Sequence, residues 1–318
     1  MSEPLKATFF TLQRRDRAVL LPATLVFIVI VALLVGAFVA LNWGRLLGLY
    51  EFIQSTPAQQ PSDEQAGQFM WSVFGLFGGA MLLSFPIYLT IAAYEAACLR
   101  WMIRGEAPGL FGLTIDNDVW RVWGVYWCWL VAQMIVSFAM SIATMPLMFM
   151  MMGEMMRDPS PEGMMRWQLT VQLPLSLLQY LPLIFIGVRF GPAAATSVAR
   201  KRFSFVDAWK VTEDRFWSLF GSFALLWVIA WLLIVAASIP VVLQMWPHFW
   251  SMWSTPSEDA MQAYFNAYLA RETLVRIGIG YGVMAVVGLW LALMSYGVNA
   301  RAALVALDEG KIQADPAS

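Results

Sequence analysis

The stretch FWSLFGSFALLWVIAWLLIVAASIPVVLQM, residues 216–245, decides the fold class of this chain. It contains no Asp, Glu, Lys or Arg, and the charge-free run around it extends over residues 216–257. A helix needs about 20 mostly apolar residues to cross the roughly 30 Å hydrocarbon core of a bilayer. The stretch lacks the alternation of polar and apolar residues that is typical of a membrane β-barrel. We therefore predict a transmembrane helix here.

Five further charge-free runs are long enough to span a membrane, and we predict an all-α, polytopic protein with six transmembrane helices. The second half of the 216–257 run is too polar and too broken, at Pro247, His248 and Pro256, for a second crossing. We treat residues 1–318 as one six-helix transmembrane domain. The predicted spans cover about 18–43, 69–94, 120–150, 168–190, 216–245 and 275–301.

The composition agrees with a membrane protein. Of 318 residues, 60% are hydrophobic and 13% are charged, whereas a soluble domain has about a quarter charged. The net charge of −1 lacks the basic surplus of a nucleic-acid-binding protein. Cys98 and Cys128 lie in or beside apolar segments, so no disulfide framework is expected. The single histidine, His248, cannot form a zinc site alone, and we predict neither a metal nor a cofactor.

The distribution of Lys and Arg predicts the orientation. Fifteen of the 20 fall on the side that holds both termini, and five fall on the other side. The positive-inside rule therefore predicts that both termini are cytoplasmic. The first apolar run is too long for a signal peptide and lacks a clear cleavage site.

Helix-start patterns occur in the outer loops. Ser62, Ser160 and Ser257 each precede acidic residues, and we expect them to cap helices. Trp246–Trp253 is rich in tryptophan, which is typical of the membrane interface. A docking surface for another membrane protein is the alternative for this segment.

The inner loop after the fourth predicted span contains a run of small residues followed by three basic residues. Ala193–Val198 is a stretch of small residues that we expect to form a helix. Arg200, Lys201 and Arg202 follow, and we predict that they bind anionic lipid headgroups. Ser204 is predicted to cap a short amphipathic helix lying in the membrane interface.

Two helical hairpins have matching features. Pro86 and Pro182 lie inside the second and fourth spans, and each is followed by small residues, arginines and an aromatic span start at Trp120 or Trp217. We therefore expect an internal repeat of spans two and three with spans four and five. Spans six and one are candidates for a third, permuted copy.

The segment Val188–Ala199, with residues 205–209 and 212–220, resembles the membrane domain joined to some glycerophosphoryl diester phosphodiesterases and related stand-alone six-span bacterial proteins. The matching features are an arginine, a small-residue helix with proline, an amphipathic segment and an aromatic span start. The resemblance covers about 40 residues and implies a membrane fold. The catalytic barrel of those enzymes has no counterpart here, so no catalytic residue can be carried over.

Two charged residues lie closest to the hydrocarbon. Glu95 and Arg189 lie near the cytoplasmic ends of the second and fourth spans, and ionisable groups in a membrane are functional candidates. If the hairpins repeat, the two face a common centre, and we predict an intramembrane charge pair. Such a pair is either a structural lock or part of an ion path.

Ten of the 20 methionines lie between Met140 and Met165, where thioethers are possible Cu(I) ligands. Methionine also fills apolar space, and no cysteine or histidine joins the cluster. The chain has no G-x-S-x-G, H-E-x-x-H or P-loop motif. We therefore predict a protein that is not an enzyme.

We expect a non-enzymatic protein of the bacterial inner membrane that organises lipid or a partner protein in the cell envelope. Its expected partners are membrane lipids of anionic charge, and either a membrane protein or a second copy of the chain. The alternative is a small-molecule or ion transporter or channel that uses Glu95 and Arg189.

Overall fold

The computed structural model describes residues 7–13, 20–55, 63–110, 112–157, 170, 172–254 and 257–314. Every named element in these ranges is a helix, and the β structure there is limited to an isolated bridge between Leu110 and Leu113. The prediction of a helical chain with six helices of spanning length is confirmed. These helices are α3 (Leu20–Leu41), α5 (Asp63–Arg104), α6 (Asn117–Arg157), α8 (Leu173–Phe190), α11 (Phe216–Ser254) and α13 (Arg271–Asp308).

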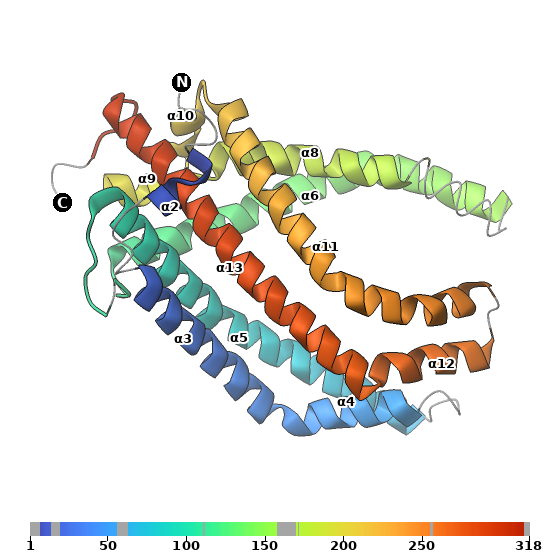
Figure 1. The fold of residues 1–318 in the computed structure, drawn as a ribbon. Helices are drawn as coiled ribbons and strands as arrows, with labels where there is room; N and C mark the ends of the chain where they lie inside the picture. Colours follow the sequence, from blue (N-terminus) through green and yellow to red (C-terminus); the bar gives the residue numbers. More distant parts are fainter. Residues whose placement is uncertain are drawn as a thin grey trace.

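Shorter helices connect the long ones. At one end of the bundle lie α2 (Phe10–Gln13), α9 (Ala193–Arg200) and α10 (Ala208–Thr212), and at the other lie α4 (Trp43–Ser55) and α12 (Glu258–Leu269) (Figure 1). The first and last described segments lie at the same end as α9. An even number of spans requires this arrangement.

The long helices pack as neighbours in the order α5, α6, α8, α11 and α13, and α13 packs back against α5. Helix α3 packs against α5. The short helix α9 packs against α5, α6 and α13. From the end that holds α9 the long helices diverge, with α6 and α8 running away from α3, α5 and α13 (Figure 1).

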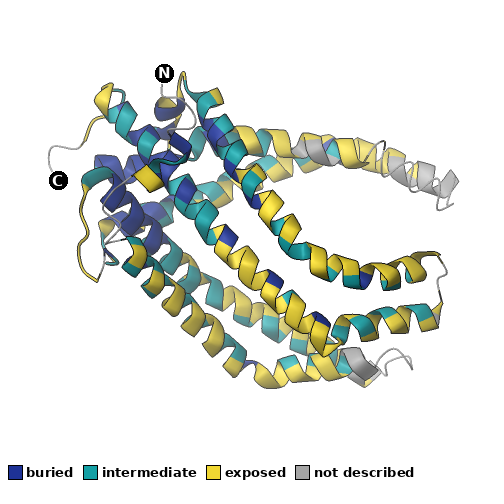
Figure 2. Cartoon of the chain, viewed as in Figure 1, coloured by how far each residue is buried: buried dark blue, intermediate teal, exposed yellow. Residues whose placement is uncertain are grey.

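The buried residues are concentrated at the end that holds α9, which we call the packed end (Figure 2). Its core comprises residues 92–102 of α5, 118–125 of α6, all of α9 and 294–306 of α13. Towards the opposite end, which we call the open end, large apolar side chains are mostly exposed, such as Trp71, Phe138 and Leu243. The packed end therefore carries most of the side-chain packing.

Three helix ends meet in this core, because α5, α9 and α13 all pack against one another. Gly105 and Lys201 directly follow α5 and α9, with φ of 71° and 56°, and Gly310 follows α13 after Glu309, with φ of 69°. A left-handed residue ends a helix by turning the chain away from its axis. The small residues of Ala193–Ala199 and Ala300–Ala303 let the three backbones approach closely.

The two helical hairpins that the sequence predicts to be a repeat, spans two and three and spans four and five, are similar only in part. Pro86 and Pro182 lie inside α5 and α8, and Arg104 and Arg200 end the corresponding helical segments. However, α5 is continuous to Arg104, whereas the second hairpin breaks after Phe190 into α8 and α9. Pro192 explains the break, because it has no N–H to donate to the preceding turn.

The fifth span is longer than predicted. Helix α11 continues past the predicted end at about 245 and through Pro247 to Ser254. Rings four residues apart stack along this extension, Trp246 on Trp250 at 6.1 Å and Phe249 on Trp253 at 6.3 Å between centroids. Such pairs support a helix. They help α11 continue through Pro247, where the sequence predicts a break.

The capping predictions have mixed outcomes. Ser257 caps α12, since its side chain accepts a hydrogen bond from the Ala260 N–H at 3.1 Å. The cap predicted at Ser204 is wrong: a turn at Phe205 precedes α10, and the Ser204 N–H donates to Ser197 Oγ. Ser62, Ser160 and the predicted start of the fourth span at 168 lie outside the described residues.

Candidate functional site

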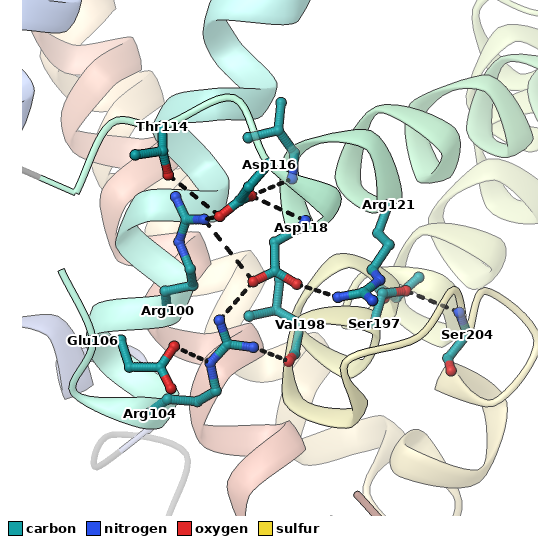
Figure 3. A network of polar contacts seen from close by, with 12 residues as sticks. Arg100, Arg104, Glu106, Thr114, Asp116, Asp118, Arg121, Ser197, Val198 and Ser204 are labelled. Carbon is teal, nitrogen blue, oxygen red and sulfur yellow. Dashed lines mark hydrogen bonds and ion pairs between the residues drawn. The ribbon is translucent and has the colours of Figure 1, made fainter. Parts of the chain in front are cut away.

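The packed end holds a network of ion pairs between α5, α6 and the loop that joins them (Figure 3). The Arg100 side chain is 1% exposed; it pairs with Asp116 and donates to the Gly112 carbonyl at 2.8 Å. Asp116 also accepts from the backbone N–H groups of Asp118 and Val119 at the start of α6. One carboxylate thus caps α6 and neutralises a buried arginine.

Asp118 is the second acceptor in this network. Its carboxylate, 7% exposed, accepts hydrogen bonds from Arg104 and Arg121, each at 2.6 Å. Arg104 also donates to the Val198 carbonyl of α9 at 3.0 Å. The network therefore connects α5 and α6 to α9, and its charged groups pair mostly with one another.

The predicted headgroup-binding residues Arg200, Lys201 and Arg202 lie in three different settings. Arg200 is buried, pairs with Asp207 and donates to the Gln313 carbonyl at 3.1 Å. Lys201 has a left-handed backbone and ends α9. Arg202 has a side chain that is 52% exposed and lies 3.9 Å from Asp207. Arg200 thus serves an internal contact, and Arg202 faces outward.

Glu95 lies inside the bundle rather than at its surface. It is 6% exposed, and the Tyr126 hydroxyl of α6 donates to its carboxylate. Tyr296 of α13 and Cys98 lie close to the same carboxyl. Within the described part of the chain, no ion pair reaches Glu95. It is therefore a buried acid held by tyrosines from neighbouring helices.

Arg189 is held by aromatic rings. Its guanidinium lies 4.7 Å from the ring centre of Trp209, 5.3 Å from that of Phe216 and 5.6 Å from that of Phe185. It also donates to the Thr212 carbonyl at 3.1 Å. These contacts fasten α10 to the last turns of α8.

The structure does not bring Glu95 and Arg189 together as the predicted pair. Glu95 bonds to Tyr126, and Arg189 bonds to the segment around α10; no ion pair between the two occurs among the described residues. The prediction assumed that equivalent positions in two repeats face one centre. Glu95 follows Pro86 by nine residues and Arg189 follows Pro182 by seven, so the two do not occupy the same position on their helices.

Comparison with family models, with curated proteins and with solved structures finds no match to this chain. The resemblance to the phosphodiesterase-associated membrane domain stays a prediction.

The sequence analysis assigned no role to Arg100, Asp116 and Asp118. The sequence contains a signal for them, because Arg100 and Arg104 are one helical turn apart and the two acids follow at the start of the next helix. Among the described residues, no group of three or more His, Cys, Asp or Glu side chains could hold a metal ion. The methionine cluster, whose thioethers are possible Cu(I) ligands, extends to Met164 and Met165, which lie outside those residues.

Proposed function

We propose that this chain is a non-enzymatic membrane protein that organises lipid or a partner protein in the envelope of a bacterial cell. The observation that carries the proposal is the contrast between the two ends of the bundle. At the packed end, ion pairs connect the helices. Towards the open end the long helices diverge, and large apolar side chains are exposed. In a bilayer, those side chains meet lipid tails or the helices of a partner.

The exposed side chains support this proposal. On α11, the residues buried near the packed end are Leu219, Ser222, Leu226 and Ala230, and Met245 is the one buried beyond them. Trp231, Leu243 and Trp250 on the same helix are each more than half exposed. These exposed apolar side chains are available to lipid tails or to the helices of a partner.

We further propose that the packed end faces the cytoplasm of the inner membrane. The Lys and Arg residues that the sequence analysis placed inside include Arg104, Arg200 and Lys311, and they lie at the packed end. Arg45, Arg271 and Arg276 lie towards the open end. A C-terminal green fluorescent protein fusion is expected to fluoresce, and a C-terminal alkaline phosphatase fusion is expected to be inactive. An active phosphatase fusion would contradict the orientation.

Native mass spectrometry tests the function. The protein is released from its membrane in a mild detergent and its intact mass is recorded. We expect phospholipid molecules, or a partner chain of defined mass, to stay bound at a fixed number per protein. A bare chain that recovers no lipid when lipid is added back would argue against the proposal.

A transporter is the second candidate, and Glu95 favours it. An acid buried within a membrane-spanning helix, with no cation paired to it among the described residues, is costly and marks a functional position. Replacing Glu95 with Gln keeps the shape and the hydrogen bond from Tyr126. If the chain conducts ions, flux through proteoliposomes should fall in Glu95→Gln and stay in Glu106→Gln, which changes an exposed acid. Absence of flux in the parent protein would exclude this candidate.

A further inference from the structure

The segment that follows α9 and includes the first two residues of α11, residues 201–217, has an inner and an outer face. On the inner face, Phe205 stacks on Phe190 of α8 at 4.8 Å between ring centroids, and Ala208 and Val211 are buried. On the outer face, four large apolar side chains are exposed by 41–77%. They are Phe203, Val206, Trp209 and Trp217. We call residues 201–217 the interfacial segment.

The interfacial segment is fixed at the level where a spanning helix ends. The Trp209 ring lies 6.0 Å from Phe185 and 5.8 Å from Phe190, both in the last turns of α8. Arg189 holds the same ring and the Thr212 carbonyl. The span formed by α8 and α9, residues 173–200, is long and apolar enough to cross a membrane. On the proposed function, the cytoplasmic end of this span, where α8 is followed by α9, lies near the boundary between lipid tails and headgroups. Trp is the residue that favours this boundary.

Two cations lie beside the exposed apolar side chains. The side chains of Arg202 and Lys210 are 52% and 63% exposed. Both approach Asp207, at 3.9 and 3.5 Å, but Asp207 also pairs with the buried Arg200. Residues 201–217 contain four basic and three acidic residues, so the segment has a net charge of +1. One carboxylate cannot neutralise three cations.

We propose that the interfacial segment docks on the membrane surface and binds anionic phospholipid headgroups through Arg202 and Lys210. Val206, Trp209 and Trp217 enter the boundary between headgroups and tails, and the two cations contact the phosphates. The inference rests on the proposed function and names its lipid class and its contact residues. It differs from the sequence prediction, which assigned the binding to Arg200, Lys201 and Arg202. The structure shows Arg200 engaged inside the protein, and it brings Lys210 to the surface.

Lipid selectivity tests the proposal. The protein is equilibrated in mixed micelles with equal amounts of phosphatidylglycerol and phosphatidylcholine, and the retained lipids are counted by native mass spectrometry. Each surface cation is expected to contribute about fivefold to anionic lipid binding, so R202Q/K210Q should weaken phosphatidylglycerol binding roughly 25-fold. K210R should retain it. R45Q/R271Q, which makes the same change in net charge at the open end, should retain it as well.

A depth measurement provides a second readout that does not depend on affinity. A nitroxide on Val206→Cys, in a Cys128→Ala background, should be accessible to oxygen and protected from a water-soluble nickel chelate in lipid nanodiscs. The same label on Glu106→Cys should be accessible to the chelate. Equal chelate access at the two positions would overturn the docking of the segment.

The outcomes separate this inference from the proposed function. Lipid retained without preference for phosphatidylglycerol, and unchanged in R202Q/K210Q, overturns the inference and leaves the proposed function standing. Failure of every variant and of the parent to retain any lipid or partner overturns both.

Discussion

Three arginines converge on Asp118 at the start of α6. Arg104 and Arg121 donate to its carboxylate, and Arg100 lies 4.0 Å away while pairing with Asp116. Burial of a single charge is unfavourable unless partners compensate for it. The consequence of losing Asp118 is therefore a cluster of partly buried guanidinium groups without their shared acceptor.

We predict that Asp118→Asn destabilises the protein by about 3–5 kcal/mol, the usual cost of breaking a buried ion pair. Tryptophan fluorescence during thermal unfolding in detergent measures the effect. Glu106→Gln is the matched control, because Glu106 also pairs with Arg104, at 2.9 Å, but its side chain is 49% exposed. It should change stability by about 1 kcal/mol or less. Equal melting of the two variants would contradict the prediction.

Sequence reasoning at the residue scale identified where charges approach the membrane but not which groups they contact. Glu95 was found from its position near the end of an apolar run. Its hydrogen-bond donor, Tyr126, lies 31 residues away on another helix, and no local pattern relates the two. Arg189 was assigned an acidic partner, but the fold surrounds it with Phe185, Trp209 and Phe216. Aromatic residues are so frequent in this chain that their spacing does not single out these three.

At the scale of a single element, helix α9 packs closely against its neighbours because most of its residues are small. All eight are buried, and the helix packs against α5, α6 and α13. The sequence predicted this helix from Ala193–Val198 but not its position between three others. A run of alanines indicates that close packing is possible, but it does not indicate which helices pack against it.

Ala195→Leu should overpack this contact and destabilise the protein by about 1–3 kcal/mol or more. Ala37→Leu makes the same substitution on α3, where the alanine is exposed, and should leave stability within about 0.5 kcal/mol. Thermal unfolding of both variants in one detergent provides the comparison. A loss in Ala37→Leu as large as in Ala195→Leu would show that the packing of α9 is not the cause.

The contact of α2 with α13 depends on a glycine. A Cβ on Gly297 would lie 2.1 Å from Thr11 Oγ1 and 2.9 Å from the Thr11 backbone nitrogen. Thr11 Oγ1 donates to the Leu293 carbonyl at 2.9 Å, so the two segments are closely joined.

We expect Gly297→Ala to displace α2 and to speed proteolysis of the N-terminal segment several-fold. Gly280→Ala, on the same helix with no atom within 4 Å of the added Cβ, should leave the cleavage rate unchanged and gain up to about 1 kcal/mol from helix propensity. If Gly297→Ala is cut no faster than the parent, α2 does not depend on this close approach.

At the scale of the whole molecule, the bundle is far from compact. The chain has an accessible surface of 19946 Å² for a mass of 35.7 kDa, whereas a compact monomer of this mass has roughly 13,000 Å². Charge-free runs predicted six spans from the sequence. They did not predict the divergence of the spans, because apolar residues that face lipid and those that face another helix look alike.

We predict that added phospholipid raises the thermal stability of the detergent-solubilised protein. Ligand at 100 times its dissociation constant contributes about 2.7 kcal/mol when it binds only the folded state. Melting curves at increasing lipid concentration measure this effect. In Asp118→Asn, which changes the packed end, lipid should raise the melting temperature by the same amount, although the melting temperature without lipid is lower. A melting temperature independent of lipid would contradict the prediction.

The position of the core has a consequence for biosynthesis. The packed end combines residues 92–102, α9 and residues 294–306, and the last of these is synthesised near the end of the chain. Residues 92–102 and α9 are therefore synthesised while their surfaces still lack this third partner. The packed end is complete only once α13 has been synthesised.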